Sequence, residues 1–131
     1  MSRTRKRVKQ FFKTFRELIV ASPLSRWTLL ASFLIFLAML ALPIWRVVPL
    51  ASTKPFIPLH YNIYFGVDRF GPWEQAFVIP ALGLLFWFIS AIMQTIFFRK
   101  EKLLVRFFAM STVFIELIFL VAIILLILLN I

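Results

Sequence analysis

One carboxylate lies inside an apolar run. Glu116 is the only charged residue between Phe107 and Leu129, about nine residues from the start of that run. A carboxylate near the middle of a bilayer costs roughly 3 kcal/mol or more, so we expect it to be protonated, to be paired or to face a polar interior. If this protein moves protons or cations, Glu116 is the residue that would carry them.

Few polar side chains could serve Glu116 as partners. Thr112 lies one helical turn away on the same face, and Ser90 and Gln94 lie one turn apart in the preceding apolar run. We predict that the neutral acid donates a hydrogen bond to Gln94, to Ser90 or to a backbone carbonyl. A proton relay or cation site, and a contact within an oligomer, are the alternatives.

The second group of reactive residues surrounds the only histidine. His60, Asp68 and Glu74 could offer three ligands to a metal on an outer surface, although spacings of eight and six residues impose no geometry. We favour a structural interpretation, in which the side chains of His60, Asn62 and Asp68 satisfy backbone groups of a proline-rich turn region. Ligand binding by the ordered loop is the alternative. No metal ligand set, cofactor or catalytic residue is predicted.

This histidine belongs to a loop that carries a motif. The stretch 46–75 is rich in proline and aromatic residues, which predicts an ordered loop folded against the membrane surface. Within it, alternation from Leu59 to Phe65 predicts a short strand, and Gly66 predicts a turn. The motif reads IPLHYN, then GVDRFG, and comprises Pro58, His60, Tyr61, Asn62, Gly66, Asp68, Phe70 and Gly71.

The motif resembles the signature loop of a bacterial membrane domain of unknown function found at the N-terminus of SdpI-like immunity proteins. The resemblance covers about residues 28–98. It implies that the loop joins two transmembrane helices on the extracytoplasmic side, and it implies an immunity-like role.

The elements that position these residues are three apolar runs. The chain has 63% hydrophobic and 15% charged residues and no cysteine, a composition that excludes an ordinary soluble domain. Uncharged or nearly uncharged runs at 27–45, 76–98 and 107–129 are each long enough to cross a bilayer. We predict an all-α integral membrane protein with three transmembrane helices in a single membrane domain, 1–131, with loops at 46–75 and 99–106.

Charge asymmetry predicts the orientation. Twelve cations flank one side of the runs: Arg3, Arg5, Lys6, Arg7, Lys9, Lys13, Arg16, Arg26, Arg99, Lys100, Lys102 and Arg106. The other side has only Arg46, Lys54 and Arg69. The positive-inside rule therefore predicts a multi-pass protein of a bacterial inner or plasma membrane, with a cytoplasmic N-terminus and an extracytoplasmic C-terminus.

The N-terminal segment 3–22 has the pattern of a basic amphipathic helix. Its apolar residues recur at spacings of three and four: Val8, Phe11, Phe12, Phe15, Leu18 and Ile19. We predict an interfacial helix that binds anionic headgroups of the bilayer. The alternative is a docking site for a ribosome, a nucleic acid or a protein. Because the basic residues behind the net charge of +10 flank the apolar runs, we do not predict nucleic acid as a partner.

Three functions are consistent with these features. The favoured one is a noncatalytic binding, accessory or immunity-like subunit, whose partner is a second copy of the chain or another membrane protein. The second is a proton- or ion-coupled transport component that uses Glu116. The third is an outer-face metal-dependent enzyme that uses His60, Asp68 and Glu74; it ranks last because no nucleophile or phosphate loop accompanies them.

Overall fold

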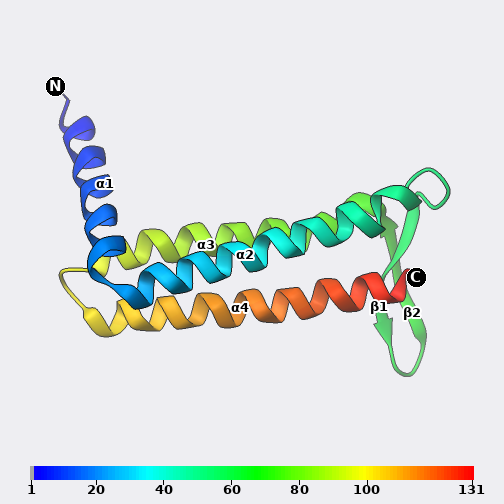
Figure 1. Ribbon diagram of the computed structural model, residues 1–131. Coiled ribbons are helices and arrows are strands. Elements are labelled where there is room, and N and C mark those ends of the chain that lie inside the picture. The colour runs from blue at the N-terminus through cyan, green and yellow to red at the C-terminus, as the bar shows by residue number, and fades with distance from the viewer. Residues whose placement is uncertain (1) are drawn as a thin grey trace. The chain divides into compact units, whose positions relative to one another are not determined.

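The computed structural model describes residues 2–131, and most of them are helical (Figure 1). The elements in chain order are α1 (Arg3–Ala21), α2 (Pro23–Arg46), η1 (Val48–Leu50), β1 (Phe56–Asn62), β2 (Gly66–Pro72), η2 (Trp73–Phe77), α3 (Val78–Phe97) and α4 (Lys102–Leu129). Three helical stretches are long and apolar enough to cross a membrane: Pro23–Leu50, Trp73–Phe97 and Lys102–Leu129. The chain is therefore built as a multi-pass membrane protein, as its apolar runs predict.

A proline separates α1 from α2. Ser22 has an extended backbone (φ −109°, ψ 102°), and Pro23 is the first residue of α2. Proline disfavours a helical conformation in the residue before it, and it fits the first helical position, where its missing N–H costs nothing. The Ser22 hydroxyl accepts a bond from the Ser25 amide at 3.4 Å, so the same break also caps α2.

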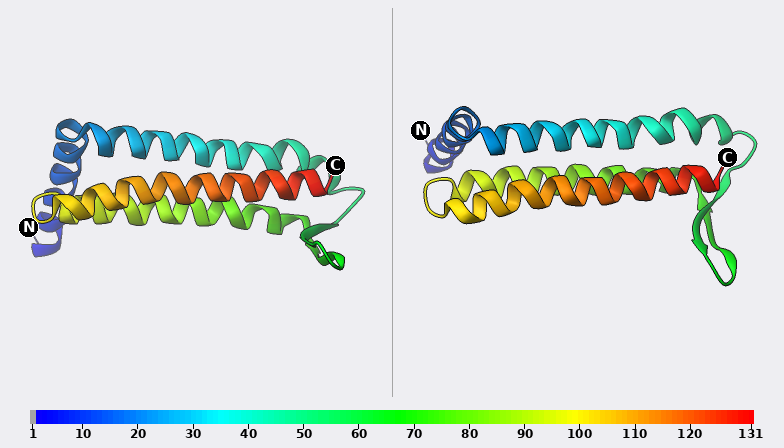
Figure 2. Two further views of the ribbon diagram at one scale, coloured as in Figure 1. Left: turned by 90° about the horizontal axis from the view of Figure 1, so that it is seen from below. Right: turned by 60° about the horizontal axis from the view of Figure 1, so that its bottom comes forward.

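The chain forms two compact units. The first comprises the chain up to Phe33 together with Leu85–Ile115. In it, the indole N–H of Trp87 donates to the Leu29 carbonyl at 2.9 Å, and the rings of Phe97 and Phe108 stack with centroids 6.4 Å apart. Helix α1 runs crosswise to the segment of α2 in this unit (Figures 1 and 2).

The second unit comprises Leu34–Leu84 and Glu116–Ile131. Its fully buried apolar side chains include Met39, Val47, Ile57 and Ile123. The strands β1 and β2 form a hairpin that runs crosswise to the helix segments of the same unit (Figure 2). Asn130, at the end of α4, fixes the hairpin there, because its amide donates to the Pro58 carbonyl at 2.9 Å.

The hairpin corrects the prediction of an all-α fold. The single strand predicted from Leu59 to Phe65 is Phe56–Asn62, and it pairs antiparallel with Gly66–Pro72. The alternation indicated one strand but could not reveal its partner, because β2 begins with glycine, ends with glycine and proline, and has between them the sequence VDRF, which does not alternate. Pairing gives the backbone of this loop hydrogen-bond partners that a single strand would lack.

Candidate functional site

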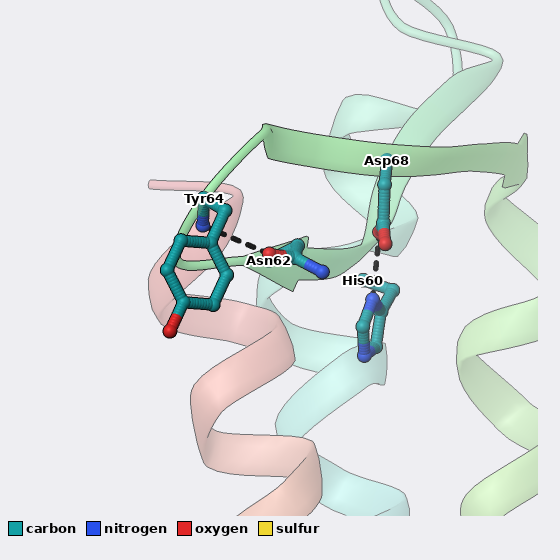
Figure 3. A network of polar contacts seen from close by, with 4 residues as sticks. All are labelled: His60, Asn62, Tyr64 and Asp68. Carbon is teal, nitrogen blue, oxygen red and sulfur yellow. Dashed lines mark hydrogen bonds and ion pairs between the residues drawn. The ribbon is translucent and has the colours of Figure 1, made fainter.

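The tip of the hairpin is a turn built by two residues of the motif. Gly66 has a φ of +74°, a left-handed conformation that residues with a Cβ rarely adopt. The Asn62 side-chain oxygen accepts a hydrogen bond from the Tyr64 amide at 2.8 Å (Figure 3). An asparagine that bonds an amide two residues further on stabilises a tight turn, so Asn62 and Gly66 together define where the chain reverses.

The other polar pair of the motif joins the two strands. Nδ1 of His60 on β1 lies 2.6 Å from Oδ1 of Asp68 on β2 (Figure 3). The strand register shifts on either side of His60, which leaves Leu59 and Asp68 outside the paired positions. Because these side chains are 64% and 36% exposed, the pair adds at most about 1 kcal/mol to stability. Its main effect is to fix the orientation of the imidazole.

The remaining motif residues have separate roles. Pro58 supplies the carbonyl that binds Asn130. Gly71 is buried, and a Cβ added there would lie 2.5 Å from Leu59 Cδ1 and 2.8 Å from Gln75 Oε1, so any residue other than glycine requires these side chains to move. Tyr61 and Phe70 are mostly exposed.

Two adjoining cavities lie beside the hairpin, in the second unit. Their volumes are about 590 and 680 Å³, and both are lined by Leu59, His60, Ile79 and Leu126. Asp68, Arg69 and Gln75 add polar groups to the first of them. This combination of an apolar wall with a few polar groups suits an amphipathic ligand or a segment of another protein.

The three possible metal ligands of the loop do not form one group. Among residues 2–131, no group of three or more His, Asp and Glu side chains lies close enough to hold a metal ion. Glu74 therefore does not lie with His60 and Asp68 in one group of possible ligands.

The carboxylate in the third apolar run is enclosed. Glu116 is fully buried, and neither of its oxygens has a hydrogen-bond partner among the described residues. Gly83 of α3 faces it: a Cβ added to Gly83 would lie 2.9 Å from Glu116 Oε2 and 2.7 Å from Met39 Cε. The space that glycine leaves open is thus the space that the carboxyl group occupies.

The predicted partners of Glu116 bind elsewhere, which corrects the expected hydrogen bond. Gln94 donates to the Ser90 hydroxyl at 3.0 Å, and Ser90 donates to the Phe108 carbonyl at 3.2 Å. Thr112 donates to the same Phe108 carbonyl at 2.7 Å. The hydroxyls of Ser90 and Thr112 thus donate to a backbone carbonyl, which is a common acceptor for serine and threonine in helices.

Four residues of these sites were not singled out from the sequence. They are Asn130, Arg69, Gln75 and Met39. For Asn130 a signal existed, because an amide at the end of an apolar helix needs partners for its donors. For Met39 no sequence signal existed, since its contact depends on how two helices are rotated about their axes.

Gly83 provides a test of the packing around Glu116. We expect Gly83→Val to lower the free energy of unfolding by about 1–3 kcal/mol, because the added methyls collide with Met39 and Glu116. Ala81→Val, on an exposed position of the same helix, is the matched control and should change it by less than about 0.5 kcal/mol.

The measurement is equilibrium unfolding in mixed micelles followed by tryptophan fluorescence. Adding Met39→Ala to Gly83→Val should recover part of the loss, because it removes the nearest colliding atom. Equal stability of Gly83→Val and Ala81→Val would contradict the close contact.

Comparison with known proteins gives no relative. No family model, no curated protein and no solved structure matches this chain.

Proposed function

We propose that this protein is a noncatalytic binding subunit of a cell membrane, and that it engages another membrane-embedded chain through the β1–β2 hairpin. One observation carries the proposal. The turn between the strands exposes three consecutive large apolar side chains, Ile63, Tyr64 and Phe65, at 82%, 87% and 83%. Exposed apolar clusters of this kind mark interaction sites.

The rest of the hairpin supports recognition of a partner. A rigid turn presents the three side chains, and the adjoining cavities beside His60 and Asp68 offer both apolar and polar contacts. A pre-organised element loses little conformational entropy on binding, which favours a specific partner over an adventitious one. The partner is a second copy of the chain or another membrane protein.

The proposal includes an orientation. The twelve-to-three distribution of cations supports a cytoplasmic α1 and α3–α4 connection, and an extracytoplasmic hairpin and C-terminus. The basic, amphipathic α1 would lie in the inner headgroup layer on anionic lipid. The resemblance of the loop motif to that of SdpI-like proteins supports an immunity-like role as one form of the binding function.

Photo-crosslinking at the hairpin tip tests the binding function. We expect p-benzoylphenylalanine at position 64 to form a crosslink to a second polypeptide in native membranes, because the Tyr64 ring is the most exposed of the three. The same group at Ser52, an exposed position of the same connection outside the hairpin, should not. Mass spectrometry identifies the product. Adducts with lipid alone at position 64, or equal yields at both positions, would refute the proposal.

A second candidate function is proton- or ion-coupled transport, and Glu116 is the observation that favours it. A fully buried carboxyl group without a hydrogen-bond partner, on a helix able to span the membrane, is a feature that transport proteins use. Three helices from one chain enclose little room for a pathway, so this function would require an oligomer.

Flux measurement separates this candidate from the first. If the protein transports protons or cations, Glu116→Gln should abolish the flux into proteoliposomes, as reported by an entrapped pH- or ion-sensitive dye. Glu101→Gln makes the same chemical change at an exposed residue outside the spans and should leave the flux unchanged. Absence of flux with the wild-type protein, or unchanged flux with Glu116→Gln, would eliminate the transport function.

A further inference from the structure

A cavity of about 600 Å³ lies in the first unit, beside the break between α1 and α2. The residues that line it come from two places: the break itself, Ala21–Ser25, and the stretch that joins α3 to α4. Both α2 and α4 begin here, at Pro23 and Lys102. These helices are two of the possible membrane spans, so in a bilayer the cavity would lie at the level of the lipid headgroups.

Three cations line the cavity: Arg99, Lys102 and Arg106. Arg99 is ion-paired with Glu17 of α1, whereas Lys102 and Arg106 have no ion pair within residues 2–131. The only nearby acidic residue of the connection, Glu101, does not line the cavity. Neither α2 nor α4 has an acidic residue in its first turn, so no carboxylate there offsets the positive charge.

The rest of the lining is apolar or carries hydroxyl groups. The apolar wall of the cavity is formed by Leu24, Phe98 and Val105, and Val105 is only 6% exposed. The hydroxyls of Ser22 and Ser25 lie 3.2 Å apart, and Ser25 is fully buried. The cavity therefore combines unpaired cations and hydroxyls with an apolar surface in one place.

We propose that this cavity is a binding site for an anionic phospholipid. The phosphate would accept charge-assisted hydrogen bonds from Lys102 and Arg106, and the upper part of an acyl chain would cover Leu24 and Val105. A soluble phosphate compound would use the cations but would leave the apolar wall open to water, which favours the lipid as the ligand. None of the residues that line the cavity belongs to the hairpin, and none is a cation of α1.

Native mass spectrometry of the full-length protein in detergent tests this site. Phosphatidylglycerol and phosphatidylcholine are the probes, titrated separately. We expect phosphatidylglycerol to bind preferentially, and we expect Lys102→Gln/Arg106→Gln to weaken its binding by about tenfold or more, because the variant loses two cations at the headgroup.

Two matched variants keep the result interpretable. Lys6→Gln/Arg7→Gln removes the same charge from exposed positions of α1 and should change the affinity by less than about twofold. Lys102→Arg/Arg106→Lys keeps both charges and should retain preferential binding, which separates loss of charge from loss of folding. A 1 mM addition of sn-glycerol 3-phosphate should not displace the lipid.

Three results would overturn the proposal. Equal affinity for phosphatidylglycerol and phosphatidylcholine would show that the negative charge of the headgroup does not contribute to binding. Equal losses of affinity in the cavity variant and the α1 variant would show that the lipid is attracted by the positive charge of the protein in general and not by this site. Displacement by glycerol phosphate would identify a site for soluble phosphates.

Discussion

The hydrocarbon core of a bilayer, as the solvent of the three apolar helices, determines most of this structure. Hydrocarbon offers no hydrogen bonds, so a segment that crosses it must satisfy each backbone group within itself. The side chains obey the same constraint. The hydroxyls of Thr28, Ser32, Thr95 and Thr112 each donate to the carbonyl four residues earlier. Even the indole of Trp87 is paired with a backbone carbonyl.

Against this background the polar atoms without a partner are informative. Among residues 2–131, the buried side-chain atoms without a hydrogen-bond partner are the oxygen of Gln94 and both oxygens of Glu116. Packing alone does not explain why they are there, because an apolar residue of similar size would fill the same space without a polar group to satisfy. Gly83, which makes room for the carboxyl group, shows that the surrounding helices accommodate it.

Irregular backbone is confined to the places where the helices end. The break at Ser22, the connection between α3 and α4, and the β1–β2 hairpin all lie outside the possible spans. The structure thus places two notable features at helix ends: cations around a cavity near Pro23, and exposed apolar side chains at the hairpin tip near Tyr64.

The sequence was sufficient for those features that depend on local periodicity. The apolar runs predicted the three long helices, the spacing of Phe11 and Leu18 predicted the helix in which they lie, and alternation around His60 predicted a strand. Features that depend on how elements meet were missed. The partner strand, the bond from Asn130 to Pro58, and the position of Gly83 against Glu116 all require a register or a helix rotation, which one strand or one helix does not encode by itself.

Membrane topology is the central claim, and cysteine labelling tests it most directly, because the native chain has no cysteine. Single cysteines at Lys9, Thr53, Lys100 and Ile131 would be exposed to a membrane-impermeant maleimide in intact cells. We expect Thr53→Cys and Ile131→Cys to be labelled at once, and Lys9→Cys and Lys100→Cys to be labelled only after the membrane is permeabilised. Labelling of Thr53→Cys and Lys100→Cys from the same side would contradict this topology.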